Sequence, residues 1–257
     1  MTEQTTQKKY ELLKDDTVEH FGRTLYRIKA LITFGLVGAG ELGGYIETEK
    51  NLDHSGNAWV YDNALVFGNA LVFGNALVFG NALVYGNAEV YGDALVFGNA
   101  LVFGNALVYG NAEVYGDALV FGNALVFGNA LVYGNAEVYG DALVYGNAEV
   151  YGNAEVYGNA EVYGDALVFG NAWVCGNALV RSFAVISERK MIFGASNVGS
   201  ENGRLTVFNG KFGLIVTRGC FTGTVDEFLS KSKEVHDDKT HHEYKLLIEV
   251  AQSRILN

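Results

Sequence analysis

Five histidines are the side chains of this 257-residue chain best suited to general-base or metal chemistry, and they are His20, His54, His236, His241 and His242. A histidine base must reach a substrate and be held by a neighbour. His54 stands alone just ahead of a long repeat, and we interpret it as a surface residue of a cap. The stretch from His236 to His242 contains metal-capable side chains, but a polar turn between two helices is predicted there. The sequence therefore predicts no catalytic, cofactor-binding or metal-binding residue.

Carboxylates and thiols offer two further chemistries, hydrolysis by paired acids and nucleophilic attack by cysteine. Glu149, Glu155 and Glu161 are spaced by one unit of the repeat that surrounds them, so we expect them on three different faces of one coil, where they cannot converge. Cys175 has no histidine near it in sequence, and Cys220 lies in a different segment. We therefore expect a protein without enzymatic activity or disulfides, in a reducing compartment.

A six-residue repeat, A-x-V-x-G-[N/D], occupies the middle of the chain, and its alanines recur at every sixth position from Ala58 to Ala178, which makes 21 hexads. Alternation places Ala and Val on one face and Leu or Glu with the aromatic residue on the other. Gly-Asn and Gly-Asp suit a tight corner. A single hexad cannot bury its Ala/Val face, but three hexads that close a triangular coil can. The repeat thus predicts an all-β solenoid, a parallel β-helix of about seven coils and about 34 Å in length.

The net charge of −11 belongs entirely to this repeat, because eleven acids and no Lys, Arg or His occur between Asn57 and Val180. A basic footprint is absent, so direct binding of nucleic acid is not expected. The unopposed acids suggest one alternative function, an acidic DNA mimic that inhibits a host DNA-processing or defence enzyme. The mimicry is incomplete, since a duplex of that length carries roughly 20 charges.

The outward positions of the hexads should form rows along the stack. Exposed apolar rows either bind a partner or a second copy, or they stiffen the stack through aromatic contacts. We therefore expect a protein partner or self-association into a homo-oligomer, with no membrane contact. The candidate partner-binding residues are Phe97, Phe103, Tyr109, Tyr115, Glu149, Glu155 and Glu161. A 24-residue unit recurs unchanged at 70–93, 94–117 and 118–141, so its glutamate moves to a new face with each copy and no face is uniform.

Segments that flank the repeat are expected to cap its open ends, because exposed strand edges invite polymerisation. We divide the chain into a β-rich N-terminal cap (1–56), the repeat (57–181), an irregular β end (182–222) and a helical C-terminal cap (223–257). Capping boxes that begin at Thr224 and Thr240 predict two helices. The polar start of the chain does not resemble a signal peptide, and no apolar run approaches the ~20 residues of a membrane span.

The hexads resemble those of hexapeptide-repeat proteins, in which a small and an aliphatic residue, here Ala70 and Val72, point inward. That resemblance implies a left-handed β-helix. Similar spacing in the bactofilins, which wind right-handed, keeps the other hand open. Many hexapeptide-repeat proteins are acyltransferases that use a histidine on a coil. The hexads contain none, so an acyltransferase-like enzyme stays only as an alternative.

The flanking segments GRTLYRIKAL, GELGGYIETEKNL and RGCFTGTVDEF resemble those of an uncharacterised group of GNA-repeat proteins from phages and prophages. This similarity covers nearly the whole chain. It implies a phage or prophage origin and a location in the host cytoplasm or in the virion, without a signal peptide. The function expected from the sequence is a structural or protein-interaction scaffold without enzymatic activity.

Overall fold

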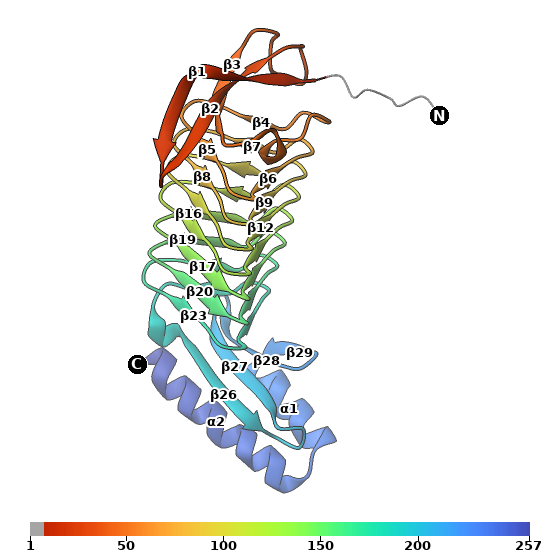
Figure 1. The fold of residues 1–257 in the computed structure, drawn as a ribbon. Coiled ribbons are helices and arrows are strands. Elements are labelled where there is room, and N and C mark those ends of the chain that lie inside the picture. The colour runs from red at the N-terminus through yellow and green to blue at the C-terminus, as the bar shows by residue number, and fades with distance from the viewer. Residues whose placement is uncertain (1–7) are drawn as a thin grey trace, which may run out of the picture.

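A parallel β-solenoid forms the trunk of the molecule in the computed structural model, which describes residues 8–257 (Figure 1). Residues 1–7 of the predicted N-terminal cap lie outside the described part. Each hexad contributes one short strand, and strands that are three apart in order stack in register, 18 residues apart. The trunk therefore has three faces, as predicted.

The first face contains β3 (Leu42–Ile46), β5 (Leu65–Val66), β8 (Leu83–Val84), β11 (Leu101–Val102), β14 (Leu119–Val120), β17 (Glu137–Gly140), β20 (Glu155–Gly158) and β23 (Trp173–Val174). The second contains β4 (Trp59–Val60), β7 (Leu77–Val78), β10 (Leu95–Val96), β13 (Glu113–Val114), β16 (Leu131–Gly134), β19 (Glu149–Gly152), β22 (Leu167–Val168) and β25 (Val185–Ile186). The third contains β6 (Leu71–Val72), β9 (Glu89–Val90), β12 (Leu107–Val108), β15 (Leu125–Val126), β18 (Leu143–Val144), β21 (Glu161–Val162) and β24 (Leu179–Val180).

The solenoid has about eight turns, one more than the hexads alone predict, because the second face has eight strands. Segments outside the repeat supply the additional rungs. Ile46 pairs with Val66 and Leu52 with Val72 above the first coil, and Ile186 pairs with Val168 below the last. The parallel β-helix is thus confirmed, whereas the left-handed winding stays a prediction.

The interior of the trunk consists of Ala and Val, as the alternation predicts. Val96, Val114 and Val132 lie on successive rungs of the second face and are all fully buried, as are the alanines that precede them. Burial of one such side chain contributes about 1.5–3 kcal/mol. Each coil is closed by only three short strands, and larger aliphatic side chains take the inward position only in the terminal rungs, at Ile46, Leu52 and Ile186.

The corners need glycine for two reasons, which Gly98 illustrates. Its φ is +72°, in the left-handed region that L side chains rarely adopt. A Cβ there would also lie 3.0 Å from the backbone nitrogen of Gly116, one coil further along. Backbone strain and close approach therefore favour glycine at the corners, and Asp62 and Ser182, with φ of +55° and +61°, replace it only in the first and last hexads.

Asparagines beside these glycines form amide ladders on the outside of the corners. Asn75 donates from Nδ2 to Oδ1 of Asp93 at 2.9 Å, and Asn111 starts a new ladder by donating to Asn129 at 3.0 Å. A carboxylate can end such a chain of bonds but cannot continue it, because it has no N–H to donate. Aspartate at this position therefore divides the rows into segments.

A β-hairpin of β1 (Tyr10–His20) and β2 (Arg23–Ala30) covers the N-terminal end by pairing with β3, and η1 (Glu49–Asn51) follows. Side chains satisfy carbonyl groups of the first coil that no further rung can reach. Lys9 Nζ donates to the carbonyl of Ala58 at 2.8 Å, and Asn51 Nδ2 donates to that of Ala70 at 2.9 Å. The end is thus closed to another rung.

An antiparallel sheet with two helices closes the other end (Figure 1). Its elements are η2 (Arg189–Met191), β26 (Ile192–Val198), β27 (Gly203–Gly210), β28 (Gly213–Arg218), β29 (Phe221–Thr224), α1 (Val225–Val235) and α2 (Asp238–Leu256). The predicted capping box at Thr224 is confirmed. The start predicted at Thr240 was wrong, since α2 begins at Asp238 and the Asp237 side chain accepts from the Thr240 backbone N–H. A carboxylate placed three residues earlier is a better cap for that N–H.

Side chains of this terminal sheet cap one carbonyl group on each face of the trunk. Thr217 Oγ1 donates to the carbonyl of Leu179 at 2.9 Å and Asn209 Nδ2 to that of Val185 at 3.0 Å. Arg204 reaches the carbonyl of Cys175 at 3.4 Å. Both ends of the stack are therefore occupied by units that cannot continue it. No helix between residues 8 and 257 is long and apolar enough to cross a membrane.

We expect Val114→Asp to unfold the protein or to lower its stability by more than about 4 kcal/mol, because the carboxylate would be buried without a partner. Urea denaturation followed by circular dichroism measures this. Leu125→Glu is the matched control, since Leu125 points outward where other hexads carry glutamate. Equal stabilities of the two variants would contradict the inward placement of valine.

Candidate functional site

The aromatic residues predicted to bind a partner belong to three ladders of stacked rings. Phe97 and Tyr115 lie in the ladder of the second face, Phe103 in that of the first and Tyr109 in that of the third. Within the ladders, ring centroids lie 4.6–5.0 Å apart and ring planes deviate by at most 6°. Each ring therefore covers the faces of its neighbours, and mainly edges and hydroxyl groups reach the solvent.

This stacking gives the rows a definite energetic role. The rings are half-buried, and an aromatic pair contributes about 0.5–1.5 kcal/mol beyond its area burial. Every such contact acts along the axis of the trunk, so the ladders resist bending and slippage between coils. Of the two interpretations left open by the sequence, stiffening is the one that the ring geometry favours.

Glu149, Glu155 and Glu161 point from three different faces of one turn, on β19, β20 and β21. They diverge, as the spacing predicts. Each carboxylate accepts a hydrogen bond from a tyrosine hydroxyl one coil earlier. The distances are 3.0 Å from Tyr133 to Glu149, 3.0 Å from Tyr139 to Glu155 and 3.1 Å from Tyr145 to Glu161. These three Tyr–Glu bonds surround the trunk as a belt.

The belt was missed from the sequence, although a simple signal marks it. Each bonded pair is a tyrosine followed 16 residues later by glutamate. Glu89, Glu113 and Glu137 follow phenylalanine at that distance and so lack the hydroxyl. In the 24-residue unit, the glutamate therefore lies one coil after a phenylalanine. Only in the last hexads does a glutamate lie one coil after a tyrosine.

The belt tyrosines are donors and not bases. Burial is the first cause that raises the pKa of Tyr139, and the hydrogen bond to Glu155 raises it further, to about 12. The pKa values of Tyr133 and Tyr145 are raised still more by burial and by their glutamates. The hydroxyl groups therefore keep their protons at neutral pH and tie adjacent coils together.

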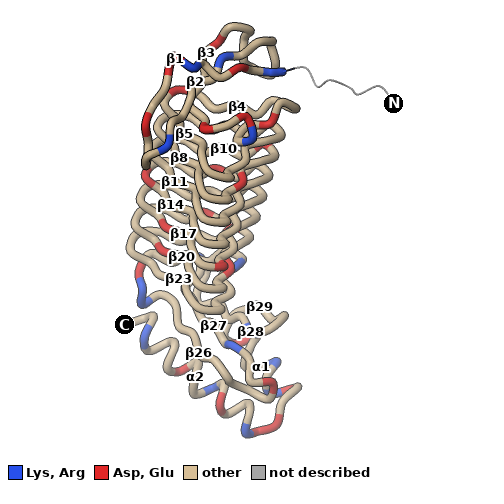
Figure 2. Tube along the Cα trace, in the orientation of Figure 1, with Lys and Arg blue, Asp and Glu red and all other residues tan. Residues whose placement is uncertain are grey.

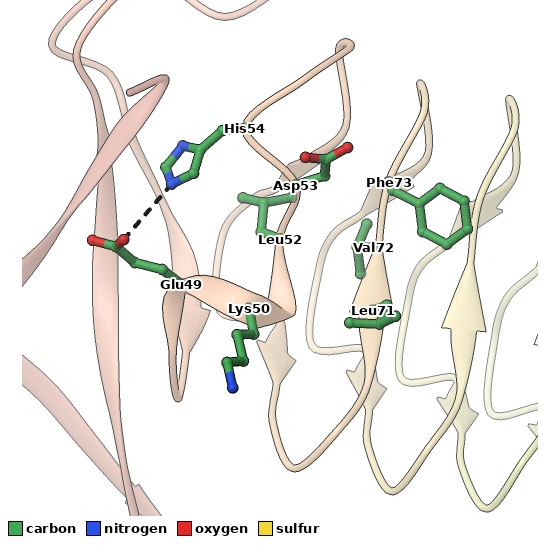
Figure 3. Close-up of a pocket in the computed structure, with 8 residues that line it drawn as sticks. All are labelled: Glu49, Lys50, Leu52, Asp53, His54, Leu71, Val72 and Phe73. Carbon is green, nitrogen blue, oxygen red and sulfur yellow. Dashed lines mark ion pairs between the residues drawn. The ribbon is translucent and has the colours of Figure 1, made fainter. Parts of the chain in front are cut away.

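His54 lies in a hollow of about 430 Å³ at the N-terminal end of the third face, beside Glu49, Asp53 and Leu71 (Figure 3). Its ring stacks on Tyr10 with centroids 4.3 Å apart. Nε2 lies 3.9 Å from Oε2 of Glu49. His20 also lies near a coil, with its ring 5.4 Å from that of Phe67, but His54 is the histidine that the sequence places directly before the repeat. The hydrogen bonds of His54 decide what it can do.

The hydrogen bonds of His54 do not suit a general base. Its Nδ1 accepts the backbone N–H of Lys9 at 3.2 Å, so the neutral ring carries its proton on Nε2, which is buried and lies nearest to Oε2 of Glu49. Nε2 is then a donor and cannot take a proton from a substrate. Burial also lowers the pKa of His54 below its ordinary value of 6.5, with Lys8 and Lys9 adding to the shift and Glu49 opposing it. The ring therefore anchors the N-terminal cap.

The remaining candidate groups are dispersed. The backbone N–H of His236 donates to the carbonyl of Ser232 and so caps α1, while His241 Nδ1 lies 3.2 Å from Ser232 Oγ. Cys175 and Cys220 are free thiols. Within residues 8–257, no three His, Cys, Asp or Glu side chains are grouped so that they could hold a metal ion.

Comparison with known proteins supports the repeat architecture. Residues 160–176 match the family model described as the YdcK beta solenoid repeat. The match spans less than one coil, so it identifies the type of repeat and carries no activity to this chain. A comparison with curated proteins gave no match.

We expect Tyr139→Phe to destabilise the trunk by up to about 1 kcal/mol, since it removes a half-exposed hydrogen bond to a carboxylate. Phe121→Tyr should add the missing hydroxyl above Glu137 and give a smaller gain. Tyr151→Phe is the control, because leucine stands 16 residues after it. Urea denaturation measures all three. A loss from Tyr151→Phe as large as that from Tyr139→Phe would contradict the Tyr–Glu pairing.

The lowered pKa of His54 predicts a pH dependence. In the unfolded chain the ring binds a proton near pH 6.5, and in the folded chain it does so only at lower pH, so stability falls as the pH drops below about 6.5. We expect melting temperatures to decline from pH 7.5 to 5 in the native protein and to decline less in His54→Gln. His242→Gln, which changes an exposed ring, should keep the native slope. Identical slopes for all three proteins would refute this role.

Proposed function

We propose that this chain is a phage-type structural protein without enzymatic activity, in which the solenoid acts as a rigid spacer and protein-interaction scaffold. The observation that carries the proposal is the 18-residue register that runs through the repeat from β4 to β25. In most hexads the Val, the aromatic ring and the corner side chain stack on their counterparts one coil later. Three hydrogen-bonded faces, three ring ladders and three amide rows thus share one axis.

Such a trunk fixes the distance and the rotation between its two ends. Seven rung spacings of about 4.8 Å give a length of about 34 Å. The N-terminal hairpin and the C-terminal sheet with its helices are different units, each attached through capping hydrogen bonds. The trunk therefore presents two dissimilar surfaces in a constant geometry, which is what a spacer requires.

Positive and negative charges occupy different parts of the molecule, as expected for a scaffold that binds partners at its ends. Lys and Arg gather at the two ends, and the trunk between them shows only acidic charge (Figure 2). Six of its eleven acids lie between Glu137 and Asp165, in the coils next to the C-terminal unit. Like charges on the trunk disfavour lateral association of its acidic coils, so a protein partner at the ends fits better than bundling of trunks.

The C-terminal helices are the partner-binding surface that the geometry favours. α2 buries Tyr244 and Ile248 against the sheet and leaves Leu246 and Val250 half-exposed on its other side. Spaced by four residues, these two side chains share one helix face. The rings of the trunk offer only edges, so this helix face is the better apolar contact for a partner.

The proposal predicts different effects for two deletions. Removal of residues 94–111 takes out one coil, so the ends should approach by about 4.8 Å without relative rotation. Removal of residues 94–117, one full 24-residue unit, should shorten the trunk further and turn one end by a third of a turn. Both variants should keep the β spectrum of the native protein, because the hexad phase is preserved.

Spin labels at Leu36 and Lys245, with both native cysteines replaced by serine, report the distance between the ends. A rigid spacer gives narrow distance distributions that shift as stated for each deletion. A broad distribution in the native protein would contradict rigidity. Turnover of acetyl-CoA by the purified protein would instead favour the acyltransferase-like alternative, and inhibition of DNA gyrase would favour the acidic DNA mimic.

A further inference from the structure

Phe21 occupies a position that is unfavourable for phenylalanine in two ways. It lies in the two-residue turn between β1 and β2 with φ +47°, and Gly22 follows with φ +70°. Turns with two positive φ values favour Asn-Gly, and another side chain there is strained by about 1 kcal/mol or more. The ring is also 75% exposed, so little burial offsets the strain. Such an outlier points to a role outside folding.

The Phe21 ring stands at the edge of a hollow of about 520 Å³ beside the first coils. Its centroid lies 6.3 Å from that of Phe67 and 6.4 Å from that of Tyr85, at tilts of 58°. The ring of His20 lies closer, with centroids 4.4 Å apart at a tilt of 56°. None of these neighbours stacks parallel to Phe21, which stays 75% exposed, so much of its ring is accessible, unlike the rings of the ladders. The hollow thus combines an accessible aromatic ring with a wall formed by the trunk.

Polar groups of the hollow both donate and accept hydrogen bonds. Asn69 heads its amide ladder and donates to Oδ1 of Asn87 at 3.0 Å. Its own Oδ1 accepts no hydrogen bond from the residues that the structure describes. Each amide also keeps one N–H hydrogen that the ladder does not use. The first amides of this ladder therefore offer a ligand one free acceptor, Oδ1 of Asn69, and one free N–H hydrogen each.

Charge in the hollow is largely balanced. Arg23 Nη1 lies 2.8 Å from both carboxylate oxygens of Glu47, and Oε2 of Glu47 also accepts the backbone N–H of Gly68 at 2.7 Å. Lys50 adds one further cation to the lining. Arg23 and Glu47 offset each other and Lys50 leaves one positive charge, whereas the groups beside Phe21 and Phe67 are the uncharged amides of Asn69 and Asn87. An uncharged ligand with groups that donate and accept, as hydroxyl groups do, matches this amide side of the hollow.

We propose that the hollow between Phe21 and the Asn69–Asn87 row binds a neutral saccharide. The C–H face of a pyranose ring would lie on the accessible ring of Phe21, and its hydroxyl groups would bond the amides of Asn69 and Asn87. A volume of about 520 Å³ lies within the usual range for small-ligand sites. The inference is independent of the spacer proposal, since it concerns the hairpin and the first coils alone.

The variant Phe21→Asn separates binding from folding. It supplies the Asn-Gly pair that the turn favours, so the melting temperature should stay unchanged or rise by about 1–3 °C. Saccharide binding should weaken at least tenfold. Phe212→Asn is the matched control, because Phe212 is 81% exposed in another hairpin turn and should keep native affinity.

A glycan array identifies the saccharides, and saturation-transfer NMR with free glucose, galactose, N-acetylglucosamine and cellobiose measures contact with pyranose C–H protons. Support requires binding by the native protein that is lost in Phe21→Asn and kept in Phe212→Asn. The proposal is overturned if no glycan binds above background, if Phe21→Asn binds equally well, or if that variant melts several degrees lower. The last result would show that the ring serves packing.

Discussion

The constant 18-residue spacing between stacked strands is the constraint on which the rest of the solenoid depends. Hydrogen bonds between coils form only if every coil returns to the same axial position, and within the repeat three equal hexads per coil ensure this. Glycine at the corner permits this return, because a side chain there would be strained and would meet the next coil. Inside, the narrow triangle of each hexad coil is filled by Ala and Val.

Because the coils are equally spaced, each side chain of the repeat lies next to a side chain at the equivalent position of the adjacent coil, which is often of the same type. For aromatic rings and amides this is favourable, since rings lie face to face and each amide has both a donor and an acceptor. For acids this stacking is unfavourable because adjacent carboxylates repel each other. Two arrangements give the carboxylates hydrogen-bond donors instead. Aspartates end the amide rows as acceptors, and the glutamates of one turn accept from tyrosines of the turn before.

The regular repeat gives the trunk few places where functional groups converge into a binding site, because equivalent groups point away from one another on three faces. Specific geometry arises where the repeat stops. At the N-terminal end, the hairpin brings Phe21 next to the first corner amides, and the backbone N–H of Lys9 donates a hydrogen bond to His54. At the C-terminal end, the sheet and α1 and α2 form a separate core. Binding is therefore proposed at the ends, and the trunk is proposed to hold them apart.

The sequence by itself determined the parallel β-helix, its three faces and its Ala/Val interior, because a strict six-residue period permits few other structures. It also determined that Glu149, Glu155 and Glu161 diverge, and it located α1 through the capping box at Thr224. Only the tertiary structure decided which individual side chains meet between coils and at the two ends. These include the Tyr–Glu belt, the eighth turn built from Ile46, Leu52 and Ile186, and the tautomer of His54. The contacts of Ile46, Leu52, Ile186 and His54 depend on how irregular segments fold back onto the repeat, and no local period encodes that path. The belt lies within the repeat and depends on the side-chain directions that tyrosine and glutamate take on adjacent coils.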